Sequence, residues 1–217
     1  MASFLEALRV QRWDDHRYYH HSRINQSLHF VSAITFLACY VLIFIDPAAA
    51  GLIGWLVAMI SRQIGHLFFE PRGYDHINQA SDEYKEEIKV GYNIQRKIVL
   101  LAIWAATPLI LYLNPSLFGL FKPYAGVGEF WHNLGILWLL LGAAGLLFRT
   151  VQLFFVRDVQ SGLVWATKIL TDPFHDIKLY HKSPLYLLRG ELIDPHHAQH
   201  TDDLDELEEL QEQHGKA

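Results

Sequence analysis

The chain contains a run of eighteen residues, from Leu28 to Ile45, without a charged side chain, and this run restricts the possible folds more than any other feature. A helix needs about 17–25 mostly apolar residues to cross a membrane. A buried helix of a soluble bundle is the alternative, but such a helix keeps a polar face. Here little more than Ser32 and Thr35 is polar. The run therefore predicts a membrane-spanning helix.

Three further apolar stretches follow, at residues 48–69, 98–113 and 134–156. Only Asp46-Pro47 separates the first of them from the opening run, which predicts a tight helical hairpin. Hydrophobic residues make up 51% of the chain and charged residues only 19%, whereas soluble domains usually carry about 25% charged residues. We therefore predict an all-α, polytopic membrane bundle of about four transmembrane helices in two hairpins.

Basic residues set the expected orientation, because short cytoplasmic loops are enriched in lysine and arginine. They fall before the first span, between the second and third spans, and after the fourth: Arg9, Arg12, Arg17, Arg23, Arg72, Lys85, Lys89, Arg96, Lys97, Arg157, Lys168, Lys178, Lys182 and Arg189. The opposite side has only Lys122. This pattern predicts that both termini are cytoplasmic, in a bacterial inner membrane or a eukaryotic endoplasmic reticulum. It has no basic stripe of the kind that binds nucleic acid.

The chain divides into three predicted parts. Residues 1–157 form a transmembrane domain with a histidine-rich N-terminal segment, residues 158–200 a cytoplasmic segment at the membrane surface, and residues 201–217 an acidic, partly disordered tail. Within the second part, Asp158 to Leu170 is predicted to be an amphipathic helix that lies on the membrane. Asp172-Pro173 is expected to end it.

The 13 histidines are unevenly distributed along the chain. In the predicted topology, those near a span lie mostly at its cytoplasmic end, and only His132 falls on the far side. Ionisable side chains at membrane depth are costly and usually mark a functional site. The alternative is that each is an interfacial histidine that only hydrogen-bonds lipid headgroups. Their gathering at one face favours a common site.

The spacing of these histidines suggests a metal site. His66 and Glu70 are four residues apart, so on a helix both point to the same side and can share one ion. His21, Asn25 and His29 also recur at intervals of four residues. Along an unbroken helix, however, about 12 Å separates His21 from His29, which is too far for one ion with metal–nitrogen bonds of about 2 Å. Either the chain bends before Asn25, or there are two metals, or one of these histidines is not a ligand.

We favour a bend that folds His20 or His21 back over the helical hairpin. Imidazole and carboxylate ligands suit iron, zinc or manganese, and two histidines with one carboxylate are typical of non-haem Fe(II) oxygenases. The predicted metal ligands are His20, His21, His29, His66 and Glu70. The residues predicted to support this site or to hold a second metal are His16, Asn25, His175 and His181.

The same region resembles a known family. Tyr19-His20-His21 with Asn25 and Leu28-His29, followed by Gly65-His66 and Phe69-Glu70, is similar to the 2-hydroxy fatty acid dioxygenases, and the likeness covers residues 19–70. Members of that family are small membrane proteins that take part in the breakdown of phytosphingosine to odd-chain fatty acids. The resemblance implies an Fe(II)-dependent enzyme that uses O2 to shorten a 2-hydroxy fatty acid by one carbon. It implies an iron site at the histidines of these motifs, with Glu70 as a further candidate.

These observations lead to a functional hypothesis: a membrane oxidoreductase that binds a fatty acyl substrate and O2 near the cytoplasmic face. Arg23, Arg62 or Arg72 is expected to pair with the substrate carboxylate. One alternative is a histidine-rich di-metal lipid hydroxylase or desaturase, which needs His175 and His181 in the same site. Another is a non-enzymatic metal-binding or transport protein, which needs polar residues along the spans. The sequence leaves the oligomeric state open.

Overall fold

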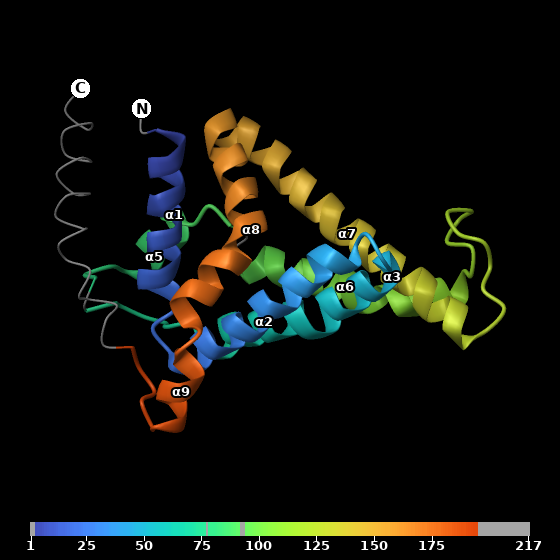
Figure 1. Cartoon of the computed structure of the whole chain (residues 1–217). Helices are drawn as coiled ribbons and strands as arrows, with labels where there is room; N and C mark the ends of the chain where they lie inside the picture. Colours follow the sequence, from blue (N-terminus) through green and yellow to red (C-terminus); the bar gives the residue numbers. More distant parts are fainter. Residues whose placement is uncertain (1–2, 77, 92–93, 195–217) are drawn as a thin grey trace.

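The computed structural model describes residues 3–76, 78–91 and 94–194, which form an all-α bundle (Figure 1). Four helical segments of this bundle are long and apolar enough to cross a membrane. They are α2 (Arg23–Leu42), the continuous helix made of α3 (Pro47–Ile53), η1 (Gly54–Met59) and α4 (Ile60–Phe68), then α6 (Ile94–Leu113) and α7 (Val127–Val156). The predicted helical membrane bundle of about four spans is therefore confirmed.

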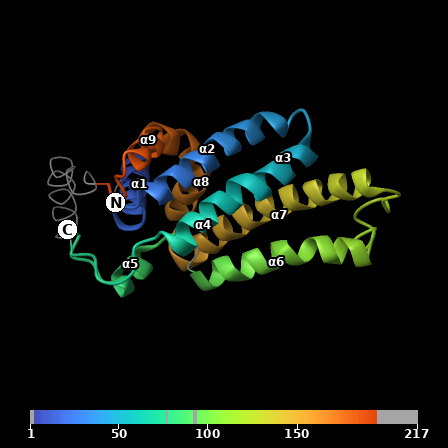
Figure 2. The same ribbon diagram turned by 90° about the horizontal axis from the view of Figure 1, so that it is seen from below.

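The four spans lie side by side in Figure 2, in the order α2, α3–α4, α7 and α6. The other helices gather toward one end of the spans: α1 (Phe4–Tyr19), α5 (Asp82–Ile88), α8 (Val159–Tyr180) and α9 (Ser183–Leu188). The three basic segments identified in the sequence belong to this end. The turn between α2 and α3 and the connection at residues 114–126 lie at the opposite end.

Polar caps explain why the helices begin where they do. The side chain of Ser22 accepts a hydrogen bond from the backbone nitrogen of Asn25 at 3.5 Å at the start of α2. Asp46 accepts one from Ala49 at 3.0 Å at the start of α3. Such caps satisfy backbone N–H groups that have no partner within the helix. The Asp46-Pro47 dipeptide therefore both ends the first span and starts the second, as the sequence predicts.

Small residues let the second and fourth spans cross in close contact. An added Cβ at Gly51 would run into the carbonyl oxygen of Gly135, and one at Gly135 would run into the carbonyl oxygen of Ala48. Close backbone approach through small residues is a common way for helices to associate within a membrane, where burial of apolar surface does not drive them together. This crossing fixes α3 against α7, with which it packs extensively.

A single π-helical turn, η1, interrupts the second span. Its residue Trp55 donates a hydrogen bond from Nε1 to the backbone oxygen of Trp138 at 2.8 Å, and Trp138 donates one to Oγ1 of Thr107 at 2.7 Å. Trp104 stacks on Trp55 with ring centroids 5.4 Å apart. These tryptophans join α6 to the rest of the bundle, and π turns of this kind are frequent at functional sites.

Helix α8 corrects one prediction. The sequence predicts a surface helix that ends at Asp172-Pro173. In the structure α8 continues through Pro173 to Tyr180 and packs against α2 and α7. A proline inside a helix costs about 3 kcal/mol or more. Asp172 and Asp176 on either side of it are buried and paired with Arg12 of α1 and Arg62 of α4, and these pairs hold the helix in place. The predicted acidic tail at residues 201–217, with the end of the 158–200 segment, lies outside the described residues.

The close crossing can be tested with one added methyl group. We expect Gly135→Ala to lower stability by about 1–3 kcal/mol, because the new Cβ can be accommodated only by a shift of backbone. Gly145→Ala on the same helix is the matched control, since its Cβ meets nothing within 4 Å. Thermal unfolding of both variants in detergent, followed by circular dichroism, should show a lower Tm for the first only. Equal Tm values would contradict the crossing.

Candidate metal centre

Three histidines from different parts of the chain converge near one end of the bundle. His20 lies in the turn between α1 and α2, His29 lies on α2, and His66 lies on α4. One ring nitrogen of each lies within 4.8 Å of those of the other two. The ring centroids of His20 and His29 are 4.1 Å apart, and those of His29 and His66 are 4.9 Å apart. Imidazole nitrogens gathered in this way are a typical ligand set for one transition-metal ion.

The break between α1 and α2 brings His20 into this group. Two buried amide side chains from the first turn of α2 hold the break in place. Asn25 donates from Nδ2 to the backbone oxygen of Tyr19 at 2.8 Å, and Gln26 donates from Nε2 to that of His20 at 2.8 Å. The predicted bend before Asn25 is therefore present, and His20 rather than His21 folds back over the hairpin.

Several site nitrogens are buried without a hydrogen-bond partner. His20 is 2% exposed and His29 is 0% exposed. Nε2 of His20 and both ring nitrogens of His29 make no hydrogen bond with any residue that the structure describes. An unsatisfied buried polar group costs about 1–3 kcal/mol, so a metal ion at this point fits the donor set. Burial, together with the charge of His29, lowers the pKa of His20 well below its usual value, which keeps its imidazole in the neutral form that binds a metal.

Each of the three histidines also faces an oxygen atom with its Nδ1. The distances are 3.2 Å from His20 to the hydroxyl of Tyr180, 3.6 Å from His29 to Oδ2 of Asp176, and 2.8 Å from His66 to Oε2 of Glu70. Metal-ligating histidines commonly donate their other N–H group to a carboxylate or a similar acceptor, which fixes the ring orientation and the tautomer. For His20 and His66 this arrangement leaves Nε2 available to a metal, whereas either ring nitrogen of His29 is free of a hydrogen bond within the described residues.

Tyr180 links two histidines through its hydroxyl. Nδ1 of His16 lies 3.1 Å from this hydroxyl, on which His20 also converges. If His20 donates its Nδ1–H to the tyrosine oxygen, the tyrosine O–H can donate to His16. Burial and the charge of Asp176 raise the pKa of Tyr180 well above its usual value, so the hydroxyl keeps its proton. His16, predicted as a supporting residue, thus contacts the site through Tyr180, which the sequence analysis did not identify.

Glu70 supports His66 instead of adding an atom to the three-nitrogen group. Helix α4 ends at Phe68, so the helical face expected to carry His66 and Glu70 together stops before the glutamate. One Glu70 oxygen bonds His66, and the other accepts a hydrogen bond from Lys89 at 3.0 Å. The ammonium group of Lys89 also lies 4.1 Å from the ring centroid of Tyr19. Glu70 is therefore anchored from both sides.

The other predicted histidines lie outside the three-nitrogen group. His21 donates a hydrogen bond to the backbone oxygen of Arg17 and lies 3.9 Å from Asp75. His181 is exposed, and its Nδ1 bonds the backbone oxygen of Lys178 at 3.1 Å. His175 is half-buried on α8. The structure brings together three of the five predicted ligands.

Of the three arginines proposed for a substrate carboxylate, only Arg62 lines the cavity beside the site. Arg23 pairs with Asp194 at 2.9 Å near α9, and Arg72 donates to the backbone oxygen of Leu67 at 2.8 Å in an exposed position. Neither of these two faces the cavity. Arg62 itself is already paired, because Oδ2 of Asp176 lies 3.3 Å from its guanidinium.

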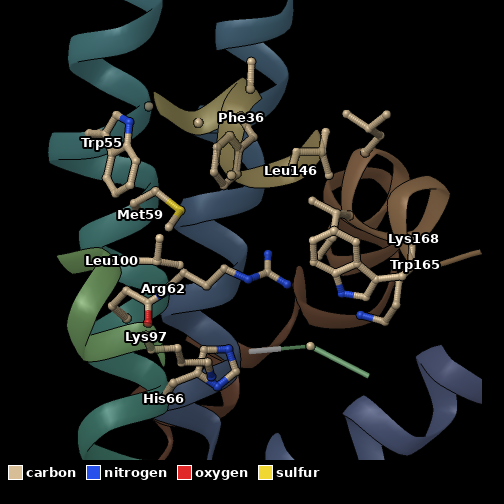
Figure 3. Close-up of a pocket in the computed structure, with 18 of the residues that line it drawn as sticks. Phe36, Trp55, Met59, Arg62, His66, Lys97, Leu100, Leu146, Trp165 and Lys168 are labelled. Atoms are coloured by element: carbon tan, nitrogen blue, oxygen red, sulfur yellow. The ribbon is translucent and has the colours of Figure 1, made fainter. Parts of the chain in front are cut away.

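The cavity has a volume of about 510 Å³ and is bordered by residues of η1 and of helices α1 to α8. Figure 3 shows that its two ends differ in character. Apolar side chains surround one end, and charged or ionisable side chains surround the other: Phe36, Trp55, Met59, Leu100 and Leu146 at the first, and Arg62, His66, Lys97 and Lys168 at the second. His66 thus belongs both to the histidine group and to the polar end of an apolar cavity.

The fold and the site define a helical membrane protein with a buried three-histidine cluster beside a long apolar cavity. Comparison of the chain with protein-family models, with curated proteins and with solved structures gave no match.

The role of Glu70 can be tested by replacing it with its amide. We expect Glu70→Gln to weaken Co(II) binding roughly 10- to 100-fold, because an oriented carboxylate beside a ligand histidine contributes that much to affinity. Glu86→Gln is the matched control, since Glu86 also pairs with Lys89, at 3.1 Å, but contacts no histidine of the group. The measurement is a Co(II) titration followed by its visible spectrum. A similar loss in both variants would assign the effect to Lys89.

Proposed function

We propose that this protein is an Fe(II)-dependent membrane oxygenase that shortens a 2-hydroxy fatty acid by one carbon with O2. The observation that carries the proposal is the group of His20, His29 and His66, whose nitrogens converge at the polar end of an apolar cavity. The resemblance of residues 19–70 to the 2-hydroxy fatty acid dioxygenases supports the choice of substrate and metal.

Three neutral imidazoles suit Fe(II) and leave coordination positions for other ligands. Bound Fe(II) would supply the redox chemistry that makes O2 reactive toward the substrate. A 2-hydroxy acid offers two neighbouring oxygen donors, its hydroxyl and its carboxylate, on the two carbons whose bond is to be broken. The overall reaction is balanced: one 2-hydroxy acid and one O2 give the acid that is one carbon shorter, one CO2 and one water.

The residues of the chain perform the remaining tasks. Glu70 and Tyr180 orient the rings of His66 and His20 through their hydrogen bonds. The apolar walls of the cavity exclude water from an acyl chain and bury it, which is favourable. Lysine and arginine enrichment at the site end of the bundle supports a reaction at the cytoplasmic face.

A single metal per chain is favoured over a di-metal lipid hydroxylase or desaturase. That alternative needs His175 and His181 beside the other histidines, yet His181 is exposed and bonds a backbone oxygen. Among the described residues, His20, His29 and His66 have ligand atoms close enough together to share one metal ion. Three histidines also form a common zinc site, so the test must distinguish the two metals.

The test is anaerobic reconstitution of the purified protein with Fe(II) or with Zn(II), followed by addition of O2 and 2-hydroxypalmitate. We expect the iron-loaded protein alone to consume O2 and to release a 15-carbon acid, detected by mass spectrometry. Because metal binding needs all the ligands of a small site, His20→Ala, His29→Ala and His66→Ala should each lose both bound iron and activity.

The matched control is His181→Ala, which removes an exposed histidine and should keep both properties. Retention of iron and activity in the variants of the three-histidine group would rule out this site. Iron binding without O2 consumption on 2-hydroxy acids would leave a metal site and reject the proposed reaction.

A further inference from the structure

Basic residues outnumber acidic ones among the side chains that line the cavity. Four basic residues line the cavity (Arg62, Lys89, Lys97 and Lys168), together with two acidic ones (Asp14 and Asp15). Three of the four are paired at short range: Arg62 with Asp176 at 3.3 Å, Lys89 with Glu70 at 3.0 Å, and Lys168 with Asp15 at 2.6 Å. Lys97 forms no ion pair with any residue in the described ranges.

Lys97 lies on α6 and reaches toward the histidine cluster. Figure 3 shows its side chain extending across the polar end of the cavity toward the ring of His66. The residue is half-buried. An ammonium group withdrawn from water is costly unless a negative charge or several hydrogen-bond acceptors compensate it. The simplest compensation at this point is an anion that enters the cavity.

The walls of the rest of the cavity indicate which chemical group is attached to this anion. Beyond Arg62 the walls are formed by Phe36, Met59, Leu100 and Leu146. Trp55 lines the apolar end and is fixed there by its hydrogen bond to the backbone oxygen of Trp138. A space that is apolar along its length and cationic at one end fits an ion with a hydrocarbon tail.

We propose that Lys97 binds the carboxylate of a single-chain fatty acid whose hydrocarbon tail occupies the apolar part of the cavity. Lys97 therefore takes the role that the sequence analysis gave to Arg23, Arg62 or Arg72. A carboxylate held between Lys97 and His66 lies beside the histidine cluster. The assignment of this fatty acid as an oxygenase substrate rests on the proposed function, but its binding does not require metal or O2.

Binding can be measured by quenching of tryptophan fluorescence with 9,10-dibromostearate, since Trp55 and Trp138 line the cavity. The full chain is studied in nanodiscs of uncharged lipid after removal of metal with a chelator. We expect saturable quenching that unbrominated stearate reverses. Lys97→Gln should raise the apparent Kd roughly tenfold or more, as expected for loss of a charged hydrogen bond. Lys97→Arg should keep most of the affinity.

Two matched controls separate the cavity from the lipid phase. Lys122→Gln removes an exposed lysine at the opposite end of the bundle and should leave the Kd unchanged. Gly145→Phe places a ring at a position that borders the cavity and should abolish the saturable quenching. Gly128→Phe on the same helix, where an added Cβ also meets nothing within 4 Å, should not. Circular dichroism verifies that each variant is folded.

The choice of competitor tests the head group. Stearyl alcohol should displace the probe poorly, and hexadecyl phosphate should displace it no better than palmitate does. Equal displacement by the alcohol, or an unchanged Kd in Lys97→Gln, would overturn the role of Lys97. Stronger displacement by the alkyl phosphate would overturn the choice of a carboxylate. Binding of the probe without metal, but no iron-dependent O2 consumption, would reject the proposed function alone. Iron-dependent O2 consumption without saturable metal-free binding of the probe would reject this inference alone.

Discussion

Asn25 and Gln26 each donate a hydrogen bond from a buried side-chain amide to a backbone oxygen of the preceding turn, and the site depends on these two bonds. If α1 and α2 formed one continuous helix, His20 would lie about 14 Å from His29 along its axis. The break instead places their ring centroids 4.1 Å apart. Gly65 completes the assembly, because an added Cβ there would run into Oδ1 of Asn25. Its absence lets α4 approach α2 closely enough for the third histidine to join.

The return of α8 onto the bundle supplies the second constraint. Asp172, Asp176 and Tyr180 are buried and recur every four residues, so one face of α8 presents two carboxylates and a hydroxyl to the other helices. The carboxylates pair with Arg12 of α1 and Arg62 of α4. Breaking a buried ion pair by removing one partner costs about 3–5 kcal/mol, so these contacts outweigh the hydrogen bond that Pro173 cannot make. They fix the position of Tyr180 and hence the ring that it orients.

The sequence predicts the spans well, because a long uncharged run has few stable alternatives to a membrane helix. It predicts the histidine cluster in outline, because the topology places these residues at one end of the spans. It cannot choose between the adjacent residues His20 and His21, since that choice depends on backbone dihedral angles in the turn. The contact of His21 with Asp75 and the anchoring of Glu70 by Lys89 join segments that are distant in the sequence. Tyr180 continues the four-residue spacing of Asp172 and Asp176 in the sequence. The expectation that Pro173 ends the helix leaves Tyr180 out of the predicted site.

The charges around the cluster would favour binding of the proposed metal and the proposed anionic substrate in the same site. Three imidazoles contribute no negative charge, so they leave the double charge of a divalent ion uncompensated. The nearest carboxylates are already engaged, Glu70 by Lys89 and Asp176 by Arg62. In surroundings of low dielectric constant, such an excess of positive charge is costly. An anionic substrate beside Lys97 and His66 would supply the missing charge, so each ligand would strengthen the binding of the other, as linkage requires. A membrane bundle offers both environments that this anion needs. Its hydrocarbon tail can lie in the apolar space, and its head group can lie at the basic end of the bundle.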